Sequence, residues 1–239
     1  MNAPLTGTRV AVTRPDAGEL GARLTALGAT VVHVPLIEIA DPPDGGMALR
    51  QALTRLAAFD WLVVTSANGA RRAGPAAADH PSLRLAAVGP TTAAALSAVA
   101  GREVDLVPAQ ALAEGLLAEF PREPSRVLLA QADRARTVLA DGLAAMGHSV
   151  EAVTAYRTLV RTPSPDEVAR LREVDVVVLA SGSAAEGWVA AVGPAQDVVV
   201  VALGPVTASA ATARGLRVDH VAASPDAIAV SDLLARLLP

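Results

Sequence analysis

The stretch "AVGPTTAAAL" at residues 87–96 is written again, with small changes, as "ALGPVTASAA" at residues 202–211. In both places an apolar run ends in Gly-Pro, and a threonine soon leads into an alanine-rich segment. Proline suits the first turn of a helix, and a short apolar run before a glycine turn is typical of a buried strand. The repeated stretch therefore predicts a strand, a turn and a helix, twice in one chain.

Other positions extend this repeat over the whole chain. Two further pairs share the same offset of 115 residues, namely Asp60 with Asp175 and Ser66 with Ser181. Farther upstream the offset grows to 117 (Val10 with Val127) and to 119 (Gly28 with Gly147), as small loop insertions would produce. The pattern predicts two copies of one unit, about 8–124 and 125–239, each with about five strands and five helices.

The local patterns favour α/β units on mainly parallel sheets. Short Val/Leu/Ala runs alternate with amphipathic stretches, and the strand-like "TRVAVT" (8–13) is followed by a helix that Pro15 opens and Gly28 ends. Two segments, 30–41 and 149–162, are about twice as long as the usual strand of five to six residues. They hold the same place in each copy, and we interpret them as paired connectors between two bodies.

Composition limits the class of protein. The 239 residues are 52% hydrophobic, with a mean hydropathy of +0.40, so a sizeable core is expected. No apolar run approaches the roughly 20 residues of a membrane helix, and "MNAPLTGTRV" lacks the pattern of a secretory signal. We expect a cytoplasmic protein without membrane contact.

Missing residue types exclude several kinds of chemistry. The sequence contains no cysteine and no lysine, which excludes thiolate sites, lysine Schiff bases and the phosphate-loop lysine. Its four histidines are never three or four residues apart, and no G-x-G-x-x-G follows a strand, so no metal and no cofactor is expected. A net charge of -4 with 2% aromatic residues argues against nucleic acid. Acidic small molecules remain possible ligands, because helix N-termini and a few arginines bind carboxylates whatever the net charge.

Small hydroxylic turns follow the predicted strands, where ligands bind in open parallel sheets. These turns are "TRP" (13–15), "TSANG" (65–69), "GPTT" (89–92), "ASGSA" (180–184) and "GPVT" (204–207). Each offers free N–H groups and a capping hydroxyl or amide. Any one hydroxyl can simply cap a helix, but the set favours a ligand-binding role. The expected binding residues are Thr13, Arg14, Ser66, Ala67, Asn68, Gly89, Thr92, Ser181, Ser183, Gly204 and Thr207.

Two side chains each have two open interpretations. Arg14 follows the first strand and either pairs with an acidic ligand or is a solvated surface arginine. Tyr156 is the only tyrosine and lies in the second long connector. Its hydroxyl either projects into a space between two domains or its ring packs as in an ordinary strand.

Several stretches, in this order, resemble the uroporphyrinogen-III synthase family. They are "VAVTRP", "DWLVVTSANGA", "AVGPTTAAAL" followed by "VDLVPA", "GHSVEAVTAYRTL" and "VALGPVTASAA". The resemblance runs from about Val10 to Leu234. Each stretch alone is a generic strand-turn-helix signature, so the specificity lies in their order and spacing.

The resemblance implies two flavodoxin-like doubly wound parallel-sheet domains joined by a two-stranded β-ladder, with residues 1–36 and 159–239 in one domain and 37–158 in the other. It implies a cofactor-independent cyclising lyase of tetrapyrrole and heme biosynthesis. The substrate would be hydroxymethylbilane, a linear tetrapyrrole with eight carboxylates. In the cleft between the domains it would lose water, invert ring D through a spirocyclic intermediate and close to uroporphyrinogen III. A monomer, in transient contact with the preceding pathway enzyme, is expected.

The resemblance also assigns roles to residues. Thr13, Ser66, Thr92, Ser181 and Thr207 fall on binding-loop positions, and Tyr156 matches a cleft tyrosine that helps the hydroxyl leave. The chain departs from the family pattern at Ala180 and Val206, where threonine is common. These departures leave an alternative open, a non-catalytic two-lobed protein that binds a tetrapyrrole or another anionic ligand. A duplicated nucleotide-binding protein is a third interpretation.

Overall fold

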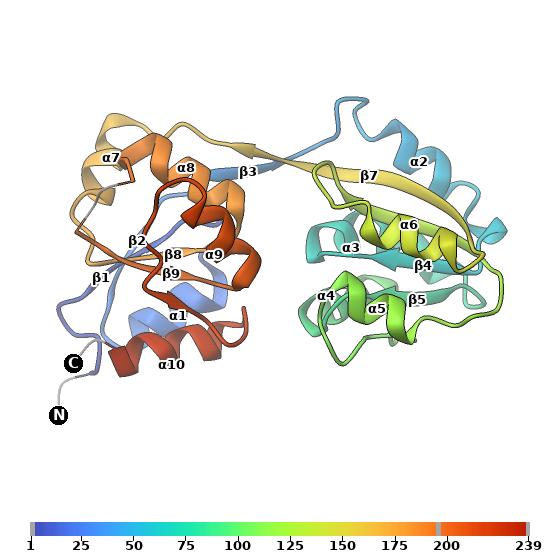
Figure 1. The fold of residues 1–239 in the computed structure, drawn as a ribbon, viewed down its shortest axis with the longest axis horizontal. Helices are drawn as coiled ribbons and strands as arrows, with labels where there is room; N and C mark the ends of the chain where they lie inside the picture. The colour runs from blue at the N-terminus through green and yellow to red at the C-terminus, as the bar shows by residue number, and fades with distance from the viewer. Residues whose placement is uncertain (1–2, 195–196, 238–239) are drawn as a thin grey trace. The chain divides into compact units, whose positions relative to one another are not determined.

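The computed structural model describes residues 3–194 and 197–237. The chain divides into two compact units, residues 1–39 with 159–239 (unit 1) and residues 40–158 (unit 2). The first division lies three residues beyond the one expected after residue 36. Unit 1 thus combines both ends of the chain, the blue and the orange-to-red elements of Figure 1, while unit 2 holds the middle.

Unit 1 contains a five-stranded sheet in the order β10-β9-β8-β1-β2. Every pair of neighbours in it is parallel. The strands are β1 (Arg9–Val12), β2 (Thr30–His33), β8 (Val176–Leu179), β9 (Val199–Ala202) and β10 (His220–Val221). The helices are α1 (Gly18–Ala26), α7 (Pro165–Leu171), α8 (Gly182–Val192), α9 (Pro205–Thr212) and α10 (Ala227–Leu237).

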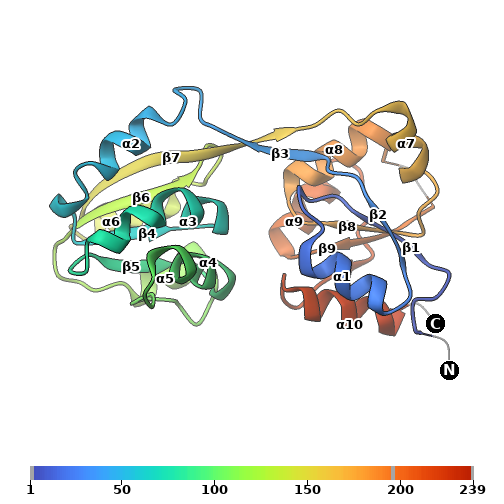
Figure 2. The ribbon, with the colours of Figure 1, turned by 180° about the vertical axis from the view of Figure 1, so that it is seen from behind.

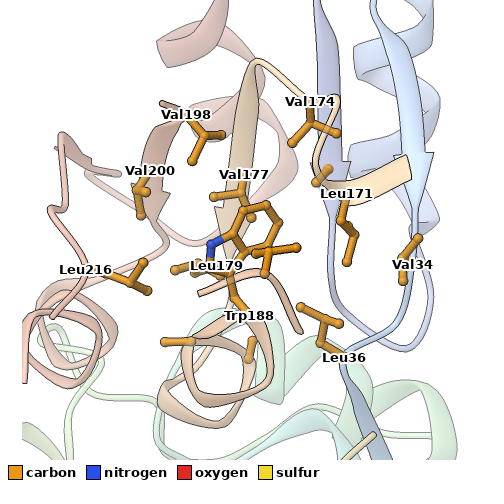
Figure 3. Packing of buried hydrophobic residues seen from close by; sticks show 14 of the residues in the cluster. Val34, Leu36, Leu171, Val174, Val177, Leu179, Trp188, Val198, Val200 and Leu216 are labelled. Atoms are coloured by element: carbon orange, nitrogen blue, oxygen red, sulfur yellow. The ribbon is translucent and has the colours of Figure 1, made fainter. Parts of the chain in front are cut away.

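Helices cover both faces of this sheet because successive strand residues point to opposite faces. On β1, Val10 and Val12 join one apolar cluster with residues of α1 and α10, while Ala11 joins a second cluster with residues of α7, α8 and α9. Figure 3 shows the second cluster, in which Trp188 of α8 packs among Val177, Leu179 and other apolar side chains. Unit 1 is therefore a three-layer α/β/α structure.

The second five-stranded sheet has the order β3-β7-β6-β4-β5, and all of its strands except β3 lie wholly or mainly in unit 2. The pairs β7-β6, β6-β4 and β4-β5 are parallel. The strands are β3 (Ile37–Ala40), β4 (Trp61–Val64), β5 (Arg84–Ala87), β6 (Arg126–Ala132) and β7 (Ser149–Val160). The helices are α2 (Met47–Leu53), α3 (Ala67–Ala73), α4 (Pro90–Ala100), α5 (Ala113–Glu119) and α6 (Val138–Ala145), with short 3-10 turns at Leu56–Ala58 and Gly74–Asp79.

Each sheet mixes strands from both copies of the sequence repeat. Within the described residues, the first copy supplies β1 to β5 and the second supplies β6 to β10, so the first two strands of each copy pair with the last three of the other. Figure 2, the reverse view, shows the path of the chain through β3 and β7. None of the described helices is long and apolar enough to cross a membrane.

The expectation of one long strand over residues 30–41 is wrong. This segment forms two strands, β2 and β3, separated by residues 34–36. Pro35 has no N–H for a ladder, while the N–H groups of Val34 and Leu36 donate to the carbonyls of Val12 and Thr13, at 3.2 and 3.0 Å. The matching segment of the second copy has no proline before residue 163 and forms the continuous strand β7.

Candidate functional site

The predicted binding residues of unit 1 lie at the carboxyl edge of its sheet. Thr13 and Arg14 follow β1, Ser181 and Ser183 follow β8, and Gly204 leads into the start of α9 with Thr207. Because these strands are parallel, their carboxyl ends share one edge. Unit 1 therefore gathers six of the twelve predicted residues at one edge.

The other six lie at the carboxyl edge of the sheet in unit 2. Ser66, Ala67 and Asn68 follow β4, Gly89 and Thr92 follow β5, and Tyr156 lies near the end of β7. The parallel pairing of these strands brings their ends to a single edge. Each unit by itself thus presents half of the predicted residues.

Two of the predicted serines are helix caps in matching positions. Ser66 accepts a hydrogen bond from the N–H of Gly69, and Ser181 accepts one from the N–H of Ala184, both at 3.1 Å. A serine hydroxyl carries one donor and two acceptor lone pairs, and the cap uses a lone pair. Capping therefore leaves the hydroxyl proton of each serine available to a carboxylate.

The two Gly-Pro turns open helices without a side-chain cap. Gly89 precedes α4 and Gly204 precedes α9, and proline is the first residue of each helix. The first helical hydrogen bonds come from the N–H groups of Ala93 and Ala208. The two N–H groups before each of these have no partner within the helix, which makes both turns suited to an anion.

The threonines of these turns are buried rather than open to the edge. Thr92 is 9% exposed and Thr207 is 8% exposed. Thr13 is completely buried, and its hydroxyl donates to the carbonyl of Val178 at 3.1 Å, which ties β1 to β8. The Thr13 side chain therefore serves the sheet itself in this structure. Arg14 is half-buried, and its carbonyl lies 2.9 Å from Nε2 of His33, so this nitrogen carries the proton and donates.

Tyr156 lies at an irregular point of the sheet. The register of β6 and β7 shifts between Gln131 and Ala132, so that Ala132 faces Tyr156. The carbonyl of Tyr156 accepts a hydrogen bond from the N–H of Asp133 at 2.9 Å. Only 7% of Tyr156 is exposed, so most of its ring is packed.

Sequence reasoning missed a pocket of about 190 Å³ at the carboxyl edge of unit 2. Its polar lining comes from Thr65, Gln131 and Arg136, and its apolar lining includes Val88 and Leu139. The repeat itself contained the signal, because Gln131 matches Arg14 at the offset of 117 that relates the first strand of each copy.

Arg136 in this pocket is already paired. It donates to both carboxylate oxygens of Glu114, at 2.9 and 3.4 Å. This contact is the main reason that the pKa of Glu114 is lowered. The pair is exposed, and its two charges cancel at the rim of the pocket.

A second pocket, of about 470 Å³, lies in unit 1 against Pro15, Pro35 and Arg161. Arg161 donates through Nε to the carbonyl of Pro35 at 2.6 Å and through Nη2 to Glu167 at 2.7 Å. The hydrogen bond from Arg161 and then the N–H of Ser164 lower the pKa of Glu167 to about 2. The charges here are matched within the protein.

The described residues contain no group of three or more His, Cys, Asp or Glu side chains that could hold a metal ion. The polar groups of both edges are hydroxyls, helix N–H groups and single arginines. Such groups bind and orient carboxylates.

The fold defines a class of α/β protein with two parallel sheets, each of which has polar turns at the carboxyl ends of its strands. Comparison with known proteins narrows this class. Residues 18–231 match the family model described as "Uroporphyrinogen-III synthase HemD". The chain belongs to the uroporphyrinogen-III synthase family.

Individual relatives agree with this assignment. The chain is 31% identical over 176 residues to the uroporphyrinogen-III synthase of Synechococcus elongatus, an alignment that covers 69% of this chain and 66% of that protein, just under two thirds of its length. The fold is similar to the uroporphyrinogen-III synthetase of Helicobacter pylori, with a TM-score of 0.66, 16% identity and coverage of 96% of this chain and 99% of that one. It is also similar to a mutant uroporphyrinogen III synthase of Thermus thermophilus, with a TM-score of 0.61, 21% identity and coverage of 95% and 97%.

Proposed function

We propose that this chain is a uroporphyrinogen-III synthase, a cofactor-independent lyase that cyclises hydroxymethylbilane with loss of water and inversion of ring D. The match of the family model over residues 18–231 is the observation that carries the proposal. The donors at the two carboxyl edges agree with it, because the substrate bears eight carboxylates and the protein offers anion-binding turns in both units.

The protein's main task in this reaction is to hold a conformation. A pyrrole nitrogen of the substrate pushes out the hydroxyl group, so the carbon–oxygen bond breaks without a strong external acid. The relaxed chain then closes without inversion, and the enzyme must favour the bent shape in which ring D turns over. We assign the binding of the acidic arms to the turns at Arg14, Ser66, Ala67, Asn68, Gly89, Ser181, Ser183 and Gly204, with Thr13, Thr92 and Thr207 contributing through their backbone.

Tyr156 is the residue that we assign to the departure of the hydroxyl group. A neutral phenol is a hydrogen-bond donor at pH 7, and a positioned donor next to the leaving oxygen stabilises the charge that develops there. Its location at the carboxyl edge, beside the register shift of β6 and β7, supports this role. The phenol gives its proton to the departing hydroxyl, which leaves as water, and the proton that the pyrrole loses on ring closure restores the neutral phenol.

We further propose that each unit is a flavodoxin-like domain, and that β3 with the end of β7 forms the two-stranded ladder between domains of residues 1–36 with 159–239 and 37–158. Numbered along the chain, the strands of unit 1 have the order 2-1-3-4-5, which is the flavodoxin-like order. Unit 2 has the same order if β6 and β7 are counted first and the bridge of Ala86 to Leu106 stands for the last strand.

The expected setting of this enzyme is the cytoplasm, where it would act as a monomer in contact with the enzyme that makes its short-lived substrate. Size-exclusion chromatography with light scattering tests the oligomeric state. Cross-linking to the preceding pathway enzyme, with and without substrate, tests the contact.

Turnover of freshly prepared hydroxymethylbilane tests the proposed function. After oxidation of the products, chromatography separates the type I and type III isomers, and we expect type III with the protein and type I without it. Type I alone, at the uncatalysed rate, overturns the proposal. Saturable tetrapyrrole binding without turnover would then identify the non-catalytic binding protein.

A further inference from the structure

All twenty basic residues of this chain are arginines, and most of them have a bonding partner within the protein. In the described residues they pair with acids, donate to carbonyls or stack on rings, as Arg55 does with Glu151 and Arg84 with Trp61. Six guanidinium groups have no such contact with any described residue, namely those of Arg14, Arg122, Arg157, Arg170, Arg172 and Arg236.

Burial separates these six into two kinds. Four of them are exposed, so water satisfies their charge, but Arg14 and Arg157 are half-buried. Arg157 differs further, because its Nε is completely enclosed and has no hydrogen-bond acceptor in the described part of the chain. Arg9 and Arg102 also have an enclosed Nε, yet their terminal nitrogens bond to Glu173 and to the carbonyl of Leu83. An arginine never loses its charge, so an enclosed donor without an acceptor makes Arg157 a cation that lacks a partner among these residues.

Arg157 lies at the carboxyl edge of unit 2. It is the residue after Tyr156 on β7, beyond Ala132, where the paired strand β6 ends. Asp133, the acid next along from β6, does not form an ion pair with it and instead accepts a hydrogen bond from the N–H of Thr158 at 3.4 Å. At the opposite end of β7, Glu151 does pair with an arginine, at 2.8 Å. The strand is thus charge-matched at its start and unmatched at the edge where ligands bind.

We propose that Arg157 binds one carboxylate of the ligand, with its two terminal nitrogens donating as a fork to the two oxygens of an acetate or propionate arm. This inference rests on the proposed function, which supplies a ligand with many such arms. A planar fork matches a carboxylate, and the single ammonium group of a lysine does not reproduce it. The assignment adds a charged binding residue in unit 2, where the predicted contacts are hydroxyls, an amide and backbone N–H groups.

Binding of uroporphyrin III, a stable macrocycle with eight carboxylates, tests the inference independently of turnover. In fluorescence titrations, Arg157→Gln should weaken the affinity by about 10- to 100-fold, as expected for a charge-assisted fork. Arg157→Lys should recover only part of it. Arg55→Gln is the matched control, because it removes the same charge beside the other end of β7, and its affinity should stay within about twofold of the unchanged protein.

The same proteins are then assayed with hydroxymethylbilane, where Arg157→Gln should raise KM more than it lowers kcat. Equal uroporphyrin affinity in Arg157→Gln and the unchanged protein overturns the inference, as does complete recovery by lysine. Should Arg157→Gln fail to fold, Arg157→Met keeps the aliphatic stem and is judged by the same criterion. Arg157-dependent binding by a protein that makes only the type I isomer would overturn the proposed function and leave this inference standing.

Discussion

Both units have the same contacts at the amino ends of their strands and different contacts at the carboxyl ends. Asp60 Oδ2 accepts a hydrogen bond from the N–H of Arg126, and Asp175 Oδ2 accepts one from the N–H of Arg9, both at 2.7 Å. At the other end, the Thr13 hydroxyl of unit 1 ties β1 to β8, whereas the matching residue of the second copy is Ala130, which has no hydroxyl. The two copies therefore share the contacts at the amino edge of each sheet and differ at the carboxyl edge.

The connectors show the same divergence. At the offset of 119, Ile37 matches Tyr156, and both are 7% exposed. Equal burial of an isoleucine and a tyrosine shows that packing alone does not require the hydroxyl. At the offset of 115, Arg72 on α3 matches Gly187 on α8, and these two residues make different contacts in the two units.

The largest effect is expected for Tyr156→Phe. Removing the hydroxyl should lower turnover by about 10- to 100-fold, because the leaving group loses a donor, while the ring still fills its place. Isomer-resolved kinetics and thermal unfolding measure the two effects separately. Unchanged turnover would make Tyr156 equivalent to Ile37, a packing residue only.

Next comes Gly187→Ala, which should cost about 1 to 2 kcal/mol of stability. A Cβ at this position would lie 2.8 Å from the carbonyl oxygen of Leu36, and that carbonyl is held by the N–H of Arg161. The clash should outweigh the roughly 1 kcal/mol that alanine gains over glycine inside a helix. Urea unfolding measures the loss.

The matching change in unit 2 is Arg72→Ala, which breaks the ion pair with Asp41. Since Asp41 is mostly exposed, the expected cost is only about 0.5 kcal/mol. A larger cost for Arg72→Ala than for Gly187→Ala would contradict the view that close packing at Gly187 contributes more to stability than the ion pair of Arg72.

Ser66→Ala and Ser181→Ala should have nearly equal effects on stability, about 1 kcal/mol each, because both serines make the same cap at the same distance. Their effects on KM distinguish a cap from a binding residue. If both serines also bind the substrate, KM should rise in both variants. A loss of stability with unchanged KM would reduce them to caps.

The last difference concerns stability in acid. The pKa of Glu167 falls from an ordinary 4.5 to about 2 in the folded protein, mainly through Arg161 and then Ser164. A lowered folded pKa means that this stabilisation is complete above about pH 4.5 and disappears as the pH falls towards 2. Thermal midpoints of Glu167→Gln and the unchanged protein should therefore differ at pH 6 and converge near pH 2.

Asp44→Asn is the matched acid variant of unit 2. Asp44 accepts hydrogen bonds from the N–H groups of Ala48 and Gly46, and these bonds lower its pKa, as the contacts of Glu167 lower the pKa of that residue. Its difference from the unchanged protein should also shrink in acid. A gap that widens towards pH 2 in either variant would contradict the assignment.

Much of this arrangement could be predicted from the sequence. The repeated Gly-Pro turns and the alternation of apolar and amphipathic runs indicate parallel α/β sheets, and the turns after the strands indicate where polar groups gather. Other features depend on long-range contacts. The broken strand at Pro35 needed the ladder partners of Val34 and Leu36, and the burial of Thr13 needed its neighbour β8.

Arg157 shows a different limit of sequence reasoning. An arginine beside the only tyrosine carries no signal by itself, because most arginines in a sequence are solvated or paired. What distinguishes Arg157 is the enclosure of Nε and the lack of an acceptor among the described residues, and both depend on every element packed around it. A site defined by a missing partner becomes visible only in three dimensions.

The strand order of unit 1 also bears on how the chain is synthesised. β1 pairs with β8, with Val10 opposite Val176, so β1 is synthesised long before the strand with which it pairs. The strands β4, β5, β6 and β7 lie largely within residues 40–158 and pair with one another, so this part of the chain can form its sheet before β8 is synthesised. Until translation passes β8, the nascent N-terminal strands expose an open edge, the feature on which chaperone capture or misassociation acts.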